Sequence, residues 1–299
     1  MKVLNFGSLN YDNVYSVEHI VQPGETVFSA KLELFCGGKG LNQSVALARA
    51  GAEVRHAGMV GPDGERLRDA CRENGIDCRY IRTVDRRTGH AVIQVSGSGQ
   101  NSIVLFGGAN RQNTKEFVDE VLADFGEGDL VLLQNEINLV EDIIDKAYEK
   151  KMRIALNPSP FDSSLSACDF QKVSVFLINE IEGAQITGEK EPEEMMKEML
   201  NRYPNAKVVL TLGKSGVIYG DQAHRYAHGT YRVEVVDTTA AGDTFTGYFL
   251  ASCLDGSTVP EALRIASVAS SMAVSKMGAA DSIPYLADVL KARLEPVCG

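Results

Sequence analysis

The chain of 299 residues is 44% hydrophobic and 23% charged, values typical of a globular protein with a large core. Its formal net charge of −10 argues against a nucleic acid or an anionic membrane as a partner. If the ligand is an anion, the positive charge that binds it must be local, from helix ends, a metal ion or a few basic side chains.

The cysteines and histidines give no sign of a disulfide framework or of a zinc site. The six cysteines include no C-x-x-C pair, and the five histidines are scattered along the chain. The first ten residues lack the pattern of a signal peptide, and no run of 18 apolar residues predicts a membrane span. We therefore expect a cytoplasmic protein with reduced thiols and no membrane partner.

Short apolar runs, taken in chain order, predict buried strands at residues 3–7, 129–134, 153–157, 173–179 and 207–213. Between them, apolar residues spaced at i, i+3 and i+4 predict amphipathic helices, as at 139–152 and 193–203. Strands that alternate with helices indicate an α/β fold, a doubly wound and mainly parallel sheet with helices on both faces. Since no linker divides the chain, we expect a single domain over residues 1–299.

Two further stretches alternate apolar and polar residues and lie outside this series. Residues 26–35 and 90–108 predict strands of a small separate sheet, and the second stretch folds back at 97–100 like a hairpin. Such a sheet needs its apolar face covered by substrate, by the main domain or by another subunit. We expect two of these sheets to pack face to face in a two-fold homodimer. The apolar residues assigned to that interface are Val27, Leu32, Leu34, Val92, Ile93, Val95, Ile103 and Leu105.

Two common nucleotide-binding motifs are missing from the sequence. The segment "LGKSG" (212–216) contains the G-K-S of a P-loop, but Val208 stands where that motif requires glycine. No G-x-G-x-x-G follows the first predicted strand, which removes the main support for a Rossmann dehydrogenase. An oxidoreductase is therefore the least favoured class of enzyme.

Polar residues gather at the start of a predicted helix within "GGKGLNQ" (37–43). Gly37 and Gly38 let backbone amides approach a ligand, and Lys39 and Asn42 can hydrogen-bond hydroxyl groups. A tight turn before an ordinary amphipathic helix is the alternative.

The segment "NEIE" (179–182) ends another predicted strand. The spacing of Asn179 and Glu182 fits a capping box, which is the favoured explanation for the segment taken alone. The same carboxylate and amide could also order Mg²⁺ waters beside a triphosphate.

A third segment, "DTTAAGDTFTG" (237–247), places Asp243 after three small residues. Ala240, Ala241 and Gly242 leave backbone amides uncovered at a helix start, where such amides form an anion site. Asp is also a favoured N-cap residue, so Asp243 alone would predict helix capping. We expect both properties to coincide, with Asp243 capping the helix beside the anion site.

Together, "GGKGLNQSVALARAGAEV" (37–54) and "DTTAAGDTFTGYF" (237–249) closely resemble the signatures of the PfkB, or ribokinase-type, family of carbohydrate kinases. The shorter segments "GSLNYD" (7–12) and "QNE" (134–136) match the family too, and the resemblance spans essentially the whole chain. It implies transfer of the γ-phosphoryl group of ATP to a sugar hydroxyl with Mg²⁺, and it is strongest to members that convert D-ribose to ribose 5-phosphate. Another furanose, a keto-sugar or a nucleoside remains open as the acceptor. A non-catalytic sugar- or nucleotide-binding sensor is the alternative of a different class.

The resemblance also implies roles for individual positions of this sequence. The small sheet, formed by about 11–36 and 88–109, would be a lid over the site. The sugar would contact Asn10, Asp12, Gly38, Lys39, Asn42 and Glu136. The catalytic base would be Asp243, beside an anion hole at Ala240, Ala241 and Gly242. Mg²⁺ and the nucleotide would be held by Asn179, Glu182, Thr211, Gly213 and Gly242.

A monovalent cation, expected to be K⁺, is predicted beside the anion site. Asp237 lies six residues before Asp243, and no Lys or Arg occurs between Glu234 and Asp243. A carboxylate this close to a phosphate site repels it unless a cation intervenes, and carbonyl groups of a turn at 275–282 would complete the cation site. The alternative is that Asp237 only caps a turn. The resemblance assigns the ion to Asp237, Thr239, Ala273, Lys276, Gly278 and Ser282.

Overall fold

The computed structural model describes residues 1–98 and 100–297, so Gly99 of the predicted hairpin turn and Cys298 lie outside the described residues. A nine-stranded sheet forms the main body, in the order β13-β12-β11-β10-β9-β8-β1-β4-β5. The strands from β11 to β5 pair in parallel, and β12 and β13 add an antiparallel edge. The strands are β1 (Val3–Phe6), β4 (Val54–Val60), β5 (Asp77–Thr83), β8 (Leu130–Gln134), β9 (Arg153–Asn157), β10 (Val175–Asn179), β11 (Lys207–Thr211), β12 (Val217–Gly220) and β13 (Arg225–His228).

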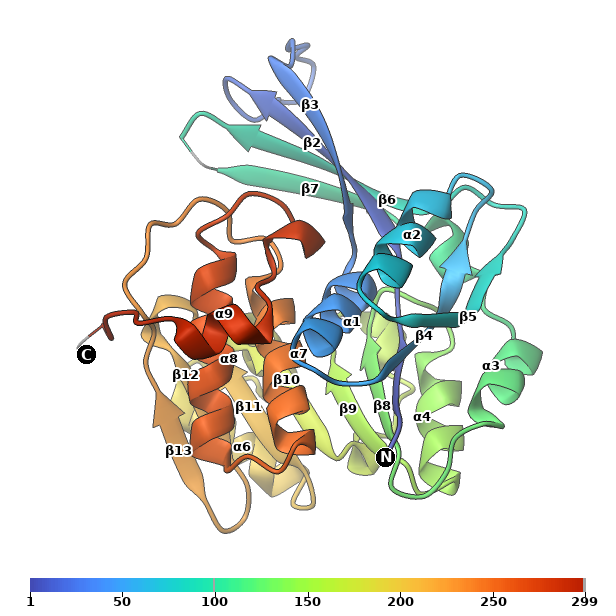
Figure 1. The fold of residues 1–299 in the computed structure, drawn as a ribbon, viewed down its shortest axis with the longest axis vertical. Helices are drawn as coiled ribbons and strands as arrows, with labels where there is room; N and C mark the ends of the chain where they lie inside the picture. Colours follow the sequence, from blue (N-terminus) through green and yellow to red (C-terminus); the bar gives the residue numbers. More distant parts are fainter. Residues whose placement is uncertain (99, 298–299) are drawn as a thin grey trace.

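Helices cover both faces of this sheet (Figure 1). Successive residues of a strand point to opposite faces, so Leu130 and Leu132 of β8 enter one apolar cluster and Val131 and Leu133 the other. The first cluster is covered by α1 (Lys39–Arg49), α2 (Glu65–Glu73), α7 (Ala241–Leu254), α8 (Val259–Ala273) and α9 (Leu286–Lys291). The second is covered by α3 (Lys115–Leu122), α4 (Val140–Glu149), α5 (Glu180–Thr187) and α6 (Pro192–Arg202). The predicted doubly wound, mainly parallel α/β fold is confirmed.

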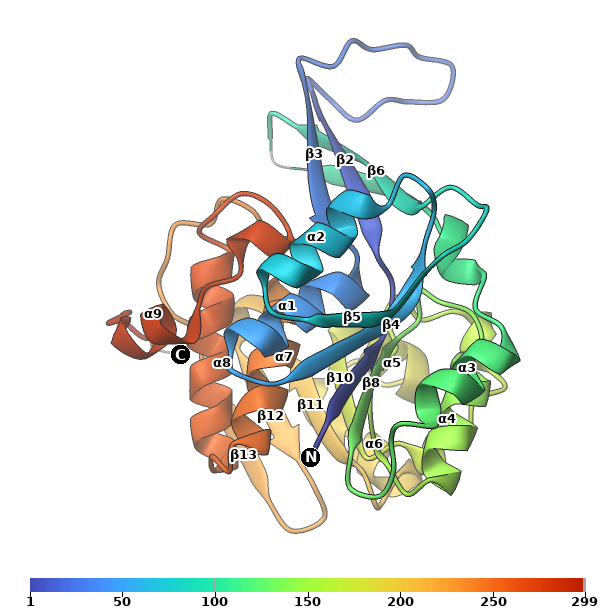
Figure 2. The same ribbon diagram turned by 45° about the vertical axis from the view of Figure 1, so that its right-hand side comes forward.

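A separate four-stranded sheet projects from one end of the main body (Figures 1 and 2). Its order is β3-β2-β6-β7, with β2 and β6 parallel and the outer pairs antiparallel. The predicted strand at 26–35 is found only from Lys31 onward, because its partner β2 ends at Val17 and residues 26–29 belong to the intervening loop. The strands are β2 (Asn10–Val17), β3 (Lys31–Gly37), β6 (Gly89–Ser96) and β7 (Asn101–Phe106).

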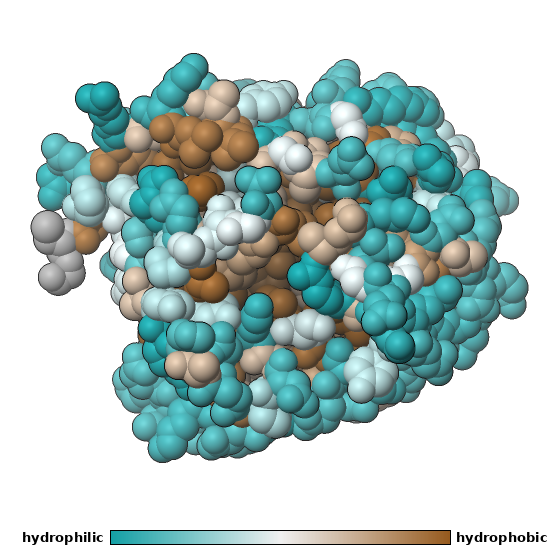
Figure 3. Space-filling view, turned by 60° about the horizontal axis from the view of Figure 1, so that its bottom comes forward, coloured by the Kyte–Doolittle hydropathy of each residue, from teal (hydrophilic) through white to brown (hydrophobic). Residues whose placement is uncertain are grey.

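Charged and polar side chains cover much of one face of the molecule (Figure 3). On the face that Figure 3 shows, hydrophilic side chains cover the lower and right-hand parts, while hydrophobic ones gather at the upper left and in the central hollow. Within residues 1–98 and 100–297, no helix has both the length and the apolar character needed to cross a membrane.

Candidate active site

A cavity of about 590 Å³ lies between the two sheets, at the carboxyl ends of the parallel strands. Ligands of open α/β sheets bind at this edge, because the loops and helix starts that follow the strands converge there. Of the residues predicted for the site, the cavity is lined by Asn10, Asp12, Gly38, Lys39, Asn42, Glu136, Asn179, Glu182, Thr211, Thr239, Ala240, Ala241, Gly242 and Asp243. The residues predicted for the site that lie outside the lining are Gly213, Asp237, Ala273, Lys276, Gly278 and Ser282.

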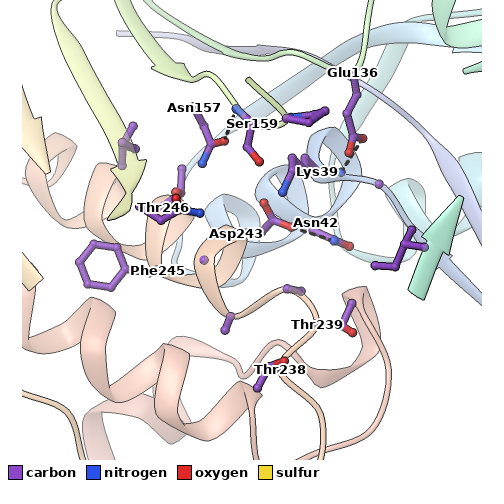
Figure 4. A pocket seen from close by; sticks show the side chains of 18 of the residues that line it. Lys39, Asn42, Glu136, Asn157, Ser159, Thr238, Thr239, Asp243, Phe245 and Thr246 are labelled. Carbon is purple, nitrogen blue, oxygen red and sulfur yellow. Dashed lines mark hydrogen bonds between the residues drawn. The ribbon is translucent and has the colours of Figure 1, made fainter. Parts of the chain in front are cut away.

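The side chain of Asp243 is held by two amides from the first turns of α1. Its Oδ2 accepts a hydrogen bond from Asn42 Nδ2 at 3.0 Å, and its Oδ1 accepts one from Gln43 Nε2 at 2.8 Å. Figure 4 shows Asp243, Asn42 and Lys39 converging in the cavity. Asp243 is only 6% exposed, so the carboxylate is buried apart from the side that faces the cavity.

The prediction that Asp243 caps its helix is wrong. The N-cap of α7 is Ala240, in a left-handed conformation with φ of 61°, and Asp243 is the third helical residue. This turn leaves the backbone amides of the first helical residues without intrahelical acceptors. The amide of Ala241 donates to the Thr238 carbonyl at 3.3 Å, so the amides of Gly242 and Asp243 are the ones left for an anion.

The start of α1 brings a backbone amide and a lysine to the cavity. Gly38 is its N-cap, with φ of 90°, a conformation that favours glycine. A Cβ added to the neighbouring Gly37 would lie 2.1 Å from Asp12 Oδ2, so glycine is needed there for Asp12 to fit. Glycine at these two positions therefore lets β3 pass directly beside the carboxylate and turn into the helix.

Glu136 joins three elements through one oxygen. Its Oε2 accepts hydrogen bonds from Ser8 Oγ at 2.5 Å, from the Lys39 amide at 3.1 Å and from Asn10 Nδ2 at 3.3 Å. Glu136 follows β8, Ser8 follows β1 and Lys39 opens α1, so the contact ties two strand ends to a helix start. Burial raises the pKa of Glu136, an effect that Lys39 and the Ser8 hydroxyl partly offset.

The carboxylates of the cavity perturb one another. Burial, with the nearby carboxylates of Glu136 and Asp243, raises the pKa of Asp12 to about 7. Burial lowers the pKa of Lys39, but the surrounding carboxylates, led by Asp243, raise it by more, so the net shift is upward. Lys39 is the one Lys or Arg among the described residues that line the cavity, and it stays positively charged.

Asn179 and Glu182 form the capping box that their spacing predicts. Asn179 Oδ1 accepts from the amides of Ile181 and Glu182 at 2.8 and 3.0 Å, and Glu182 Oε2 accepts from the Asn179 amide at 2.8 Å. Both residues also line the cavity, so capping and exposure to a ligand occur together. Within the described part of the chain, no three His, Cys, Asp or Glu residues are grouped for a metal ion. A single carboxylate fits Mg²⁺, which takes most of its ligands from water and phosphate.

The two segments predicted for the monovalent cation lie side by side. The amides of Val236 and Asp237 donate to the Val274 carbonyl at 2.8 and 3.2 Å. Asp237 Oδ1 accepts from the Thr239 amide at 2.8 Å and Oδ2 from the Gly278 amide at 3.1 Å. Asp237 therefore does cap a turn, as the alternative expects, and it also joins the two segments next to the start of α7.

The sequence did not lead us to predict several polar residues of the site. Gln43 contacts Asp243 directly and Ser8 contacts Glu136. Asn157, the last residue of β9, and Ser159 line the cavity. Gln43 stands inside the glycine-rich segment next to Asn42, which was the one available signal.

The doubly wound sheet, the second sheet beyond its carboxyl edge and the acidic cavity between them are the features of an α/β enzyme for a small polar substrate. Residues 1–286 match the pfkB family of carbohydrate kinases, and the chain belongs to this family.

The chain is similar over nearly its full length to several kinases. The ribokinase of Haemophilus influenzae is 35% identical over 298 residues, covering 95% of this chain and 96% of the relative. The ribokinase of Bacillus subtilis is 33% identical over 282 residues, covering 93% and 94%. The crystal structure of a Cryptococcus neoformans ribokinase in complex with ADP matches with a TM-score of 0.85 at 32% identity, covering 97% of this chain and 99% of that one. The structure of an Arabidopsis thaliana ribokinase with ribose and ATP matches with a TM-score of 0.83 at 27% identity, covering 97% of each chain.

Proposed function

We propose that this carbohydrate kinase transfers the γ-phosphoryl group of ATP to D-ribose and produces ribose 5-phosphate. Support for the acceptor comes from the ribokinases to which the chain is similar. The observation that carries the proposal is Asp243, a buried carboxylate at the cavity beside the N-terminal turn of α7. Attack of a hydroxyl on phosphorus needs a proton acceptor and a nearby positive potential, and this position offers both.

In the proposed reaction, the cavity aligns the sugar before proton transfer. Asp12, Asn10 and Asn42 offer hydrogen-bonding groups to hydroxyls, and Lys39 supplies positive charge among the carboxylates. Asp243 accepts the proton of the attacking hydroxyl. The amides of Gly242 and Asp243, with the dipole of α7, stabilise charge on the transferred phosphoryl group. The protein thus contributes mainly alignment and electrostatic stabilisation.

The nucleotide would lie along the ends of β10 and β11. Glu182 and Asn179 face the cavity there, and Thr211 follows them on the next strand. Mg²⁺ held by Glu182 through water would neutralise phosphate charge, which lets an acidic protein bind ATP. Gly213, two residues beyond Thr211, remains a predicted contact of the nucleotide outside the cavity itself.

We also propose a K⁺ ion between the segment at Asp237 and the turn at 275–282. The contacts of Asp237 with Thr239 and Gly278 support this site, because they hold two segments with backbone carbonyls together next to the start of α7. Backbone carbonyls of Ala273 and Lys276 and an oxygen of Ser282 would complete its ligands. A cytoplasmic location remains a prediction from the sequence.

The outer face of the four-stranded sheet supports the proposed homodimer. The structure divides the apolar residues predicted for that interface between the two faces of the sheet. Ile93, Ile103 and Leu105 line the cavity. The registers between the strands define a second face of the sheet, which points away from the cavity. The exposed apolar residues on this outward face are Leu32, Leu34, Val92, Val104 and Phe106.

Two assays test the proposed function. A phosphorylation screen over pentoses, hexoses, keto-sugars and nucleosides identifies the acceptor, and we expect D-ribose to give the highest kcat/KM. Deoxyribose belongs in the screen because a deoxyribokinase of Salmonella typhi is 27% identical to this chain. A nucleoside or a hexose as the best substrate would overturn the ribose assignment while leaving the kinase class intact.

Asp243→Asn tests the proposed base. We expect kcat to fall by about 10²–10⁴, with the fold and sugar binding kept, because the amide cannot accept the proton. The matched control is Asp255→Asn, an exposed acid at the other end of α7, which should keep the activity of the parent. Turnover of Asp243→Asn close to that of the parent would exclude the role of base.

A further inference from the structure

Three buried amide side chains form a continuous network behind Asp243. Gln43, Gln134 and Asn5 are fully buried, and all three stand outside the cavity lining. Gln43 Nε2 donates to Asp243 Oδ1 at 2.8 Å, and Gln43 Oε1 accepts from Gln134 Nε2 at 2.6 Å. Gln134 Nε2 also donates to Asn5 Oδ1 at 3.0 Å. The network thus connects α1, β8 and β1 to the carboxylate at the start of α7.

The match of donors to acceptors in the network fixes the orientation of each side-chain amide. An ionised carboxylate only accepts, so Gln43 must turn its NH₂ group toward Asp243 and its oxygen toward Gln134. Gln134 then faces two acceptors, Gln43 Oε1 and Asn5 Oδ1, and must present its NH₂ group to both. Its own Oε1 has no hydrogen-bond partner among the described residues. An unpaired buried acceptor is costly, so the two hydrogen bonds made by Nε2 are what hold this orientation.

The groups at the far end of the network are uncharged and hydrogen-bonded to one another. Asn5 Nδ2 donates to Ser44 Oγ at 2.8 Å and to the Gly40 carbonyl at 2.7 Å. Ser44 Oγ lies 2.8 Å from His56 Nδ1, and His56 Nε2 lies 3.3 Å from the Gly7 carbonyl. Burial lowers the pKa of His56 to about 4, so the imidazole is neutral at physiological pH. The hydrogen bonds of this network therefore end on one charge, the carboxylate of Asp243.

We propose that Gln43 is a positioning residue for Asp243, the base of the proposed function on which this inference rests. A carboxylate rotates easily about its last torsion, which has a broad, two-fold energy profile. Asn42 and Gln43 are successive residues of α1, and each holds one oxygen of Asp243. Asn42 lines the cavity, where a sugar can compete for its amide, whereas Gln43 is anchored from behind by Gln134. Gln43 thus keeps the carboxylate oriented while substrate exchanges.

Gln43→Met tests this role, because methionine has a similar size but no amide. We expect kcat to fall about tenfold to a hundredfold, while KM for the sugar stays within about twofold, because a single charge-assisted hydrogen bond is lost. A kcat that falls while KM is kept is the signature of a group that acts on the reacting carboxylate and not on sugar binding.

A matched control separates this effect from a general loss of stability. Asn113 is another buried amide, bonded to Asn138 and to the Asn110 carbonyl. Asn113→Ala should lower the unfolding midpoint and leave kcat, measured per folded protein, unchanged. An unchanged kcat in Gln43→Met, or a change confined to KM, would overturn the proposal.

Further variants keep the test decisive. If Gln43→Met does not fold, Gln134→Met removes the support of Gln43 and should lower kcat by less, with KM kept; an unchanged kcat there overturns the proposal. In the Asp243→Asn background, Gln43→Met should reduce kcat no further, because Gln43 acts through Asp243.

Failure of the inference is distinct from failure of the proposed function. An active parent with an unchanged kcat in Gln43→Met removes only the inference, whereas an inactive parent removes the function.

Discussion

At the scale of single residues, the cavity is defined by buried carboxylates placed close together. Asp12, Glu136, Glu182 and Asp243 are each 5–8% exposed, and Lys39 is the cation among the described lining residues. Glu136 and Asp243 are held by hydrogen bonds, whereas the pKa of Asp12 is raised by burial and by its acidic neighbours. The ionised form of Asp12 is therefore disfavoured in the folded protein.

The stability of the unliganded protein should depend on pH through Asp12. Its pKa is about 7 in the folded protein and 3.8 in its ordinary state, so between these values the folded state binds more protons than the unfolded one. Stability therefore falls as pH rises from about 4 through 7, by about 4 kcal/mol in total. We expect Asp12→Asn to remove this part of the decline in urea unfolding at pH 5 and pH 8. The control is Asp255→Asn, and parallel pH dependence of Asp12→Asn and the parent would contradict the prediction.

At the scale of elements, the start of α7 is set by its contacts with other segments. The helix begins after Ala240, a residue in the left-handed conformation with no capping side chain, although Asp243 was expected to be the cap. The carboxylate of Asp243 instead accepts a hydrogen bond from Asn42 of α1. The preceding segment is tied to the end of α8 and to Gly278 through Asp237. An ion bound at this junction would order the amides that face the phosphoryl group.

A monovalent cation should accordingly act mainly on turnover. In buffer free of alkali metal ions, added K⁺ is expected to raise kcat more than KM changes, with Na⁺ and Cs⁺ compared at equal ionic strength. Asp237→Asn should weaken the dependence on K⁺, and Asp255→Asn should preserve it. Equal rates with all three ions and without them would show that the segment needs no cation.

At the scale of the whole molecule, both faces of the four-stranded sheet carry apolar side chains. One carries Ala91 and Ile93, which are buried toward the cavity. The other exposes Leu32, Val92 and Val104, and Val104 is 66% exposed. An apolar face of this kind on a small sheet is a candidate for association with a second subunit.

A charge placed on the outward face should dissociate the proposed homodimer. We expect the parent to sediment as a dimer at micromolar concentration with sugar present, and Val104→Glu to sediment as a monomer, because two charges would be buried at the two-fold contact. Leu290→Glu is the matched control, since Leu290 is 59% exposed on α9, away from this sheet. A monomeric parent under these conditions would refute the prediction.

Much of the architecture could be predicted from local patterns along the chain. The apolar run at 153–157 coincides with β9, and the runs at 129–134 and 207–213 contain β8 and β11. Buried parallel strands are continuous apolar runs and amphipathic helices have a 3.6-residue period, so both signals are present in a short window of residues. The capping box at Asn179 and Glu182 was predictable for the same reason, because its partners are three residues apart.

The sequence by itself determined the α/β fold and which short segments face the cavity, since helix starts after strands gather at one edge of a parallel sheet. Only the tertiary structure decided what each side chain contacts there. Asp243 bonds to residues 200 and 201 positions earlier in the chain, so the place of Gln43 in the glycine-rich segment gave no sign of its contact with Asp243 or of the network behind it. The register between strands likewise decided which residues form the outward face of the small sheet. That register depends on pairing between strands and not on either strand alone.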